Sequence, residues 1–144
     1  MDFVQILADV IERGGSDIYI VPGAPITAKI NGAFVRLGED KLSIKDSEDI
    51  IVTMYTLDKE RDMSNLLLHG DDDFSLSISK MGRFRCNVYK QRGSLAAVLR
   101  VVPFGLPNPE QLHIPEAILN LGSLKRGMIL VTGPGGSGKT TTLA

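Results

Sequence analysis

A chain of 144 residues has room for one domain of ordinary size and the beginning of another. Apolar residues make up 43% and charged residues 23%, a composition that builds a core and excludes an intrinsically disordered tail. The 16 basic and 17 acidic residues give a net charge of -1, so no general basic field predicts wrapping of nucleic acid or adsorption to an anionic membrane.

No segment predicts export or membrane insertion. The opening stretch MDFVQILADVIERGG contains acidic residues and lacks the basic start and long apolar run of a signal peptide. No apolar run approaches the roughly 18 residues that a membrane-spanning helix needs. We therefore expect a cytoplasmic protein without membrane insertion, and the single Cys86 fits a reducing compartment and a core position.

The first part of the chain predicts a helix followed by an antiparallel meander. Apolar residues recur at helical spacing over residues 2–13, and Gly14 and Gly15 predict the end of that helix. Three short strands follow, predicted over residues 16–21, 26–31 and 32–37. The dipeptide Asn31-Gly32 is a strong signal for a tight hairpin between the last two.

The middle of the chain predicts two more helices and then three more strands. Candidate N-caps are Asp46 or Ser47 for the first helix and Asp58 for the second. Gly70 predicts the end of the second helix. The predicted helices cover residues 44–55 and 58–69, and the predicted strands cover 72–79, 83–92 and 94–102. Residues 1–102 therefore predict an α/β domain of the α+β type, with an antiparallel sheet and flanking helices.

The strand RFRCNVYKQR alternates between apolar and polar residues. Successive side chains of a strand point to opposite faces, which places Phe84, Cys86 and Val88 on the core face. The opposite face then carries Arg83, Arg85 and Asn87.

A new unit is predicted after a linker over residues 103–115, where the segment PFGLPNPEQLHIP has too many prolines for the interior of a sheet or helix. The unit, residues 116–144, begins with a short helix around EAILNLG. It continues into MILVTG over residues 128–133, an apolar run typical of a strand buried on both faces of a parallel sheet.

A phosphate-binding loop follows this predicted strand. Its pattern, G-x-x-x-x-G-K-[ST], is met by Gly133, Pro134, Gly135, Gly136, Ser137, Gly138, Lys139 and Thr140, with Thr141 next to it. Glycines let consecutive backbone N–H groups turn inward around a triphosphate. We expect Lys139 to bind the terminal phosphates of ATP and the Thr140 hydroxyl to ligate Mg2+.

Several segments together resemble the secretion-ATPase superfamily, and within it the PilT-type retraction ATPases of type IV pili and twitching motility. They are GSDIYI, DFSLSI, GRFRCNVYKQRG with LRVVP, and RGMILVTGPGGSGKTTTLA. The resemblance implies a PAS-like first domain, the start of a RecA-like ATPase core, and a homohexamer that works at the inner-membrane platform protein of the pilus. It also implies that Arg85 and Arg100 reach the nucleotide, while Tyr19 stands where the family usually has His.

Other polar residues receive structural interpretations. His69 and His113 are isolated from other metal-ligating side chains, so we expect a cap or surface role. The run Asp71, Asp72 and Asp73 predicts a solvated turn before a strand rather than a cation site.

The leading hypothesis is an ATP-driven pilus-retraction motor, represented here by its first domain, linker and phosphate loop and inactive as a fragment. The groups that position water and complete the metal site are expected elsewhere. Direct contact with nucleic acid is not expected. An ATPase for pilus assembly, type II secretion or DNA uptake is the alternative within the superfamily, and a non-catalytic binding and oligomerisation module is the alternative from another class.

Overall fold

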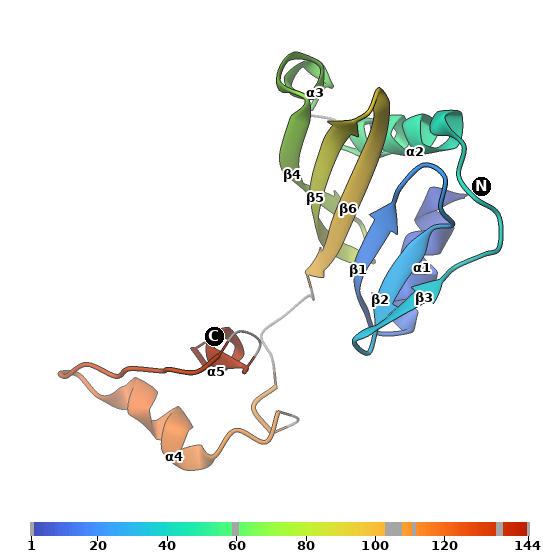
Figure 1. Cartoon of the computed structure of the whole chain (residues 1–144). Coiled ribbons are helices and arrows are strands. Elements are labelled where there is room, and N and C mark those ends of the chain that lie inside the picture. Colours follow the sequence, from blue (N-terminus) through green and yellow to red (C-terminus); the bar gives the residue numbers. More distant parts are fainter. Residues whose placement is uncertain (1, 59–60, 103–107, 111, 135–136, 144) are drawn as a thin grey trace. The chain divides into compact units, whose positions relative to one another are not determined.

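The protein is described by a computed structural model that covers residues 2–58, 61–102, 108–110, 112–134 and 137–143. The chain divides into two compact units, unit 1 over Met1–Phe104 and unit 2 over Gly105–Ala144 (Figure 1). The predicted linker over 103–115 crosses this division, and its residues 103–107 and 111 lie outside the described part of the chain.

Unit 1 is built on one six-stranded antiparallel sheet with the strand order β3-β2-β1-β6-β5-β4. Two meanders of three strands lie side by side and are joined through the pairing of β1 with β6. The predicted α+β class is confirmed. The strands are β1 (Gly15–Ile20), β2 (Thr27–Ile30), β3 (Ala33–Arg36), β4 (Asp71–Ile78), β5 (Gly82–Gln91) and β6 (Ser94–Val102).

Two helices cover one face of this sheet and leave the other face open (Figure 1). Helix α1 (Phe3–Glu12) packs against β1, and helix α2 (Ile44–Leu57) packs against β6 and β4. The covered face forms the core, where Leu7 of α1, Met54 of α2 and Phe84 of β5 are fully buried. The predicted alternation of β5 is confirmed, because Phe84, Cys86 and Val88 are buried while Arg83, Arg85 and Asn87 are exposed.

Two glycines fix the geometry of the first meander. Gly32 has a φ of 83° and follows Asn31 with a φ of 50°, which gives the tight two-residue hairpin predicted between β2 and β3. Gly15 opens β1 against the end of α1, where an added Cβ would lie 2.3 Å from Val10 Cγ1 and 2.9 Å from the Val10 carbonyl oxygen. Close packing of α1 on β1 therefore requires glycine at position 15.

The predicted N-caps in the middle of the chain are wrong, although the first of the two helices begins at Ile44 as predicted. Helix α2 is capped by Ser43, whose hydroxyl accepts a hydrogen bond from the Asp46 amide at 3.1 Å, while the Asp46 carboxylate accepts one from the Ser43 amide at 2.8 Å. Asp46 is thus the third helical residue of a capping box rather than the N-cap. Asp58 lies at the C-terminal end of α2, and helix α3 (Ser64–His69) begins six residues later, with Gly70 as the stop that was predicted.

The prediction of a solvated turn at Asp71–Asp73 is also wrong. The three residues begin β4, and strand alternation turns Asp72 to the core face, where the residue is only 2% exposed. Its carboxylate accepts hydrogen bonds from the Tyr55 hydroxyl at 2.8 Å, the Asn65 amide group at 2.9 Å and the Arg61 guanidinium. These partners compensate the cost of burying the charge, and they connect Tyr55 of α2, Arg61 and Asn65 of α3 to β4.

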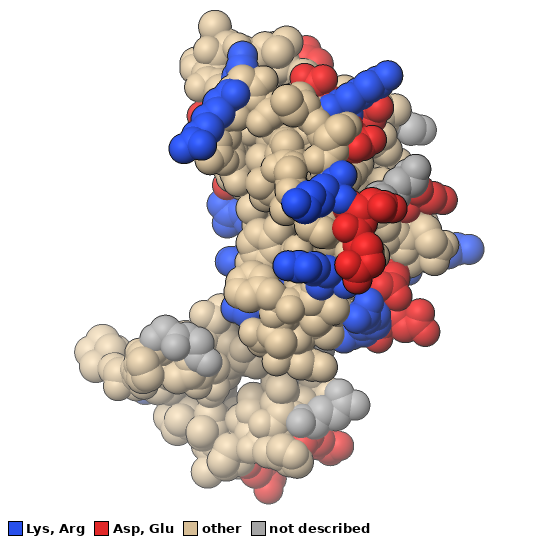
Figure 2. All heavy atoms as spheres, turned by 45° about the vertical axis from the view of Figure 1, so that its right-hand side comes forward, with Lys and Arg blue, Asp and Glu red and all other residues tan. Residues whose placement is uncertain are grey.

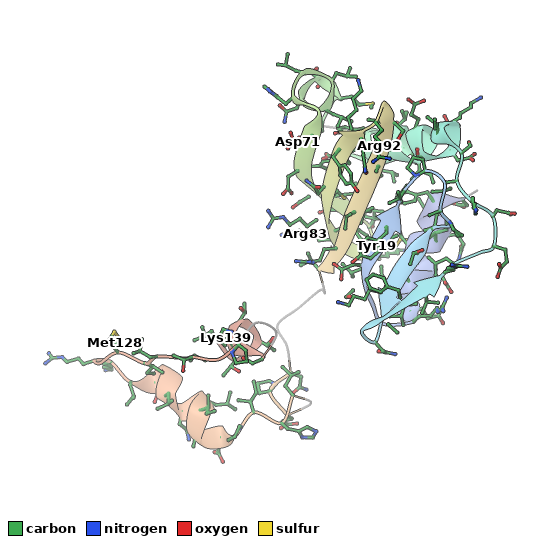
Figure 3. The ribbon with its side chains drawn as sticks, viewed as in Figure 1. Tyr19, Asp71, Arg83, Arg92, Met128 and Lys139 are labelled. Atoms are coloured by element: carbon green, nitrogen blue, oxygen red, sulfur yellow. The ribbon has the colours of Figure 1, made fainter. Side chains whose placement is uncertain are left out.

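Unit 2 contains three short helical segments in its described part, α4 (Glu116–Leu119), the 3-10 turn η1 (Asn120–Ser123) and α5 (Lys139–Leu143). The buried strand predicted over 128–133 is not formed. Met128, Ile129 and Leu130 are 81%, 51% and 74% exposed in an extended segment (Figure 3). A strand needs a neighbour for its backbone groups, and the described part of unit 2 contains no other strand.

None of the helices in the described part of the chain has the length and apolar character that a membrane crossing requires.

Candidate nucleotide-binding site

The predicted phosphate loop lies between the extended segment of unit 2 and helix α5. Gly133, Pro134, Ser137 and Gly138 belong to the described residues, whereas Gly135 and Gly136 lie outside them. Helix α5 begins at Lys139, so Thr140 and Thr141 stand in its first turn, both exposed to solvent.

Lys139 holds the two ends of the loop together. Its ammonium donates hydrogen bonds to the carbonyl oxygens of Gly133 at 2.8 Å and of Pro134 at 2.5 Å. Figure 3 shows the side chain at the start of α5, turned toward this loop. The positive charge is therefore already at the loop, and two carbonyl contacts are available for exchange against phosphate oxygens.

The residues of the loop fit a nucleotide phosphate. A Cβ at Gly133 would lie 2.7 Å from Ser137 Oγ and 3.6 Å from Ser137 Cβ, so these two residues approach each other closely across the turn. A hollow of about 220 Å³ is lined by Gly138, Lys139, Thr140 and Thr141. In this set Lys139 would bind phosphate oxygens and the Thr140 hydroxyl would serve as the ligand of Mg2+.

The two arginines singled out in the sequence meet on the open face of the sheet in unit 1. Arg85 on β5 and Arg100 on β6 are direct cross-strand partners. They border a hollow of about 210 Å³ that is lined by Asp17, Asp73, Arg85, Asn87, Val98 and Arg100. We refer to it below as the arginine pocket.

Each arginine of this pocket has a carboxylate partner that sequence reasoning missed. Arg85 donates to Asp73 from Nε at 3.3 Å and from Nη2 at 3.1 Å. Arg100 donates from Nε to Asp17 at 3.0 Å. Asp17 lies within the segment GSDIYI, and its place at an outward position of β1 was the signal that could have linked it to the arginines of the neighbouring strands.

Asp17 is held as a carboxylate although it is largely buried. Burial raises the pKa of Asp17. Hydrogen bonds from the Ser16 hydroxyl and the Arg100 guanidinium together lower the pKa by more than burial raises it, so the pKa lies below its ordinary value. The hydrogen bonds that Arg85 donates to the Asp73 carboxylate raise the pKa of Arg85 above its ordinary value.

The charges of the molecule are mixed rather than separated into one basic field. Figure 2 shows Lys and Arg side chains lying next to Asp and Glu side chains on the surface that it presents. This agrees with the net charge of -1 and restricts electrostatic binding to local sites such as the arginine pocket.

Other residues singled out in the sequence are absent from the lining of the arginine pocket. Tyr19 is half-buried on the open face of β1, and its ring centroid lies 5.5 Å from that of Phe34 (Figure 3). Cys86 is fully buried, and loss of solvation raises its pKa to about 12. His69 and His113 are exposed, and the described residues contain no group of three or more side chains able to hold a metal ion through His, Cys, Asp or Glu.

Arg83 and Arg92 are both exposed and stand outside the lining of the arginine pocket. Arg83 projects from β5, and Arg92 lies in the turn between β5 and β6 with a φ of 48° (Figure 3).

Two curated relatives match the whole chain. It is 31% identical over 144 residues to the type IV pilus ATPase PilU of Pseudomonas aeruginosa and 32% identical over 144 residues to the type IV pilus retraction ATPase PilT of the same organism. These matches cover 100% of this chain but 37% and 41% of the two relatives. The chain therefore spans about two fifths of the length of the curated relatives that it matches.

The fold is also found in a solved structure. A crystal structure of the pilus retraction motor PilT with bound ADP matches this chain with a TM-score of 0.80 and 38% sequence identity. The match covers 99% of this chain and 41% of the chain in that crystal structure. A family model described as type II/IV secretion system protein matches residues 2–144. The chain belongs to the type II/IV secretion system protein family.

Proposed function

We propose that this chain is part of an ATP-binding motor subunit of the pilus-retraction type, which couples ATP hydrolysis to the disassembly of a type IV pilus. Two observations carry the proposal: Lys139 reaches back across the predicted phosphate loop to the carbonyls of Gly133 and Pro134, and 99% of this chain matches the structure of a pilus retraction motor. The names of the relatives PilU and PilT support the assignment to pilus function.

In the proposed site the loop of unit 2 binds the phosphates of ATP. Lys139 exchanges its contacts with the carbonyls of Gly133 and Pro134 for contacts with phosphate oxygens. The Thr140 hydroxyl ligates Mg2+, which neutralises part of the charge on the phosphates when it is bound. The groups that position the attacking water are expected outside these 144 residues, so the 144 residues alone are proposed to be inactive.

In the same proposal, Arg85 and Arg100 sense the nucleotide. Guanidinium groups bind phosphate oxygens through two parallel hydrogen bonds, and the arginine pocket presents two of them from neighbouring strands. The division into a PAS-like domain over 1–102, a linker over 103–115 and the start of a RecA-like ATPase domain over 116–144 remains part of this proposal. So do a homohexameric assembly and its attachment, from the cytoplasm, to the platform protein of the pilus at the inner membrane.

Steady-state ATP hydrolysis by the natural full-length protein tests the proposal. Lys139→Ala should abolish hydrolysis, whereas Lys125→Ala, which removes an exposed charge upstream of the loop, should preserve it. Hydrolysis that survives Lys139→Ala would contradict the role of the loop. Absence of hydrolysis in properly assembled wild-type protein would favour a non-catalytic oligomerisation module instead.

A further inference from the structure

The arginine pocket brings two like charges together on adjacent strands. Arg85 of β5 stands directly opposite Arg100 of β6, and Arg100 in turn stands opposite Asp17 of β1. Side chains at such positions start about 5 Å apart, where like charges repel each other. The pocket therefore depends on the carboxylates that flank the two arginines.

The two arginines use their hydrogen-bonding groups differently. Arg85 donates from both Nε and Nη2 to the two oxygens of Asp73, so the face of its guanidinium that suits a phosphate is already occupied. Arg100 donates to Asp17 through Nε alone. Within the described part of unit 1, the two terminal nitrogens of Arg100 make no hydrogen bond, and its side chain is 72% exposed.

The two carboxylates also differ in how firmly they are held. The side chain of Asp17 is 10% exposed, and its second oxygen accepts a hydrogen bond from the Ser16 hydroxyl at 2.8 Å. Asp73 has a side chain that is 48% exposed, and among the described residues Arg85 is its hydrogen-bonding partner. Asp17 is thus a fixed support, while the pair of Asp73 and Arg85 is an exposed contact that opens at little cost.

We propose that Asp17 and Asp73 are positioning residues with opposite effects on polyphosphate binding: Asp17 holds Arg100 ready for the ligand, and Asp73 competes with the ligand for Arg85. The proposal rests on the proposed function, in which these arginines meet the phosphates of ATP. Arg100 then makes the first contact without rearrangement, and Arg85 joins only when it leaves Asp73. The exchange of Arg85 between carboxylate and phosphate gives unit 1 two distinct states, one with and one without nucleotide.

The two Asp→Asn substitutions separate this proposal from a simple charge effect. Each removes one negative charge near the arginine pocket, so a charge effect alone predicts tighter binding of an anion in both variants. A positioning role predicts that the two substitutions change the dissociation constant in opposite directions. Asp73→Asn should tighten binding about twofold to fivefold, the range of an exposed ion pair, and Asp17→Asn should weaken it by a similar factor.

The experiment measures the dissociation constant of a fluorescent, non-hydrolysable ATP analogue for the natural full-length protein by anisotropy. Asp71→Asn is the matched control, since Asp71 lies on the same strand and face as Asp73 but outside the lining of the pocket. Its dissociation constant should equal that of the wild type. In an Arg85→Ala background, Asp73→Asn should have no effect, because the arginine that it releases is absent.

Ser16→Ala provides a second test of the support at Asp17. It loosens the carboxylate without changing the charge, and it should weaken binding in the same direction as Asp17→Asn. Thermal unfolding of each variant shows whether the fold is retained. If Asp17→Asn unfolds the protein, the result with Ser16→Ala decides the role of Asp17.

The outcomes distinguish this inference from the proposed function. Binding that requires Lys139 together with shifts of the same sign in both Asp→Asn variants would overturn the inference alone. Binding of the analogue that is absent or independent of Lys139 would overturn the proposed function and this inference with it. Opposite shifts that vanish without Arg85 would support the inference.

Discussion

Arg61 donates two hydrogen bonds to the carboxylate of Asp72, from Nε at 2.9 Å and from Nη2 at 2.6 Å. The guanidinium carbon also lies 5.0 Å from the centre of the Phe74 ring, so the arginine combines an ion pair with a cation–π contact. Asp72 belongs to β4 and Arg61 to the segment between α2 and α3. Their contact fixes that segment to the edge of the sheet.

Asp72→Asn should lower the free energy of unfolding by about 1–3 kcal/mol, because an amide at this buried position cannot accept all the hydrogen bonds that the carboxylate accepts, while the half-buried Arg61 can still be hydrated. Urea unfolding of the 144-residue chain followed by circular dichroism measures this loss. Asp71→Asn removes the same charge from an exposed position of the same strand and should change stability by less than about 0.5 kcal/mol. Equal losses in both variants would contradict a specific role of the buried pair.

The stabilisation by Asp72 should depend on pH in a defined direction. The hydrogen bond from Arg61 lowers the pKa of Asp72 more than burial raises it, so the folded pKa lies far below the value of about 3.9 expected in an unfolded chain. The contribution is therefore fully present above that value and is lost as the pH falls toward the folded pKa. The difference in unfolding free energy between wild type and Asp72→Asn should stay constant from pH 7 to 5 and shrink between pH 4 and 2. A difference that grows on acidification would contradict this sign.

Gly15→Ala should destabilise unit 1 by about 1–3 kcal/mol, because the new methyl group overlaps Val10 of α1. Gly38→Ala is the matched control, since a Cβ at position 38 meets no atom within 4 Å and the glycine is exposed. It should leave stability unchanged or raise it by a few tenths of a kcal/mol through the unfolded chain. Thermal unfolding of both variants compares the two positions directly.

Arg100→Ala should reduce ATP hydrolysis by the full-length protein much more than it reduces folding stability. A charge-assisted hydrogen bond to phosphate contributes about 1.5–3 kcal/mol, which corresponds to a loss of about tenfold or more in hydrolysis. Arg83→Ala, on the same face but outside the lining of the arginine pocket, should have a smaller effect. Parallel loss of hydrolysis and stability in Arg100→Ala would sink the sensing hypothesis.

The thiol of Cys86 should report on the opening of the core. It is the single cysteine of the chain, fully buried, and has a pKa raised to about 12 by loss of solvation, so an aromatic disulfide reagent should not modify it in the native state. Reaction should be complete in urea. Asp72→Asn should accelerate the reaction under native conditions, whereas Gly38→Ala should not; rapid modification of the native wild type would show that the strand is accessible.

Much of unit 1 could be predicted because its signals are local. Asn31-Gly32 specifies a two-residue hairpin by itself, and the alternation of β5 separates the buried Cys86 from the exposed Arg85. The predicted strands agree with the observed ones to within one or two residues. Each of these features needs only the neighbouring sequence, which is why sequence reasoning found them.

The predictions failed at residues whose burial and hydrogen-bonding partners depend on parts of the chain that are distant in sequence. Asp72 reads as one of three solvated charges, but its three partners lie 7 to 17 residues away in sequence and make its burial favourable. The alternation of Asp72 with Phe74 and Leu76 was the local signal that placed it on the core face. The carboxylate at Asp17 was missed for the same reason, since its partner Arg100 is 83 residues away.

The predicted strand over 128–133 illustrates a different limit. Its apolar run is the pattern of a strand surrounded by other strands, and the described part of unit 2 provides none. The local pattern therefore indicated a strand that would need neighbouring strands, and it did not indicate the conformation of the segment in these 144 residues. The phosphate-binding role of residues 133–140 stays a prediction, and it rests on a motif whose residues are adjacent in sequence.

The pairing of β1 with β6 also has a consequence for the order of folding. Each three-stranded meander pairs strands that are close in sequence, whereas β1 and β6 join residues as distant as Asp17 and Arg100, 83 positions apart. Closing so long a loop costs conformational entropy before the contact stabilises the chain, so we expect this junction to form last. The ion pair of Asp17 with Arg100 would then form only in chains whose sheet is complete, and the proposed sensing role of Arg100 would require complete folding of unit 1.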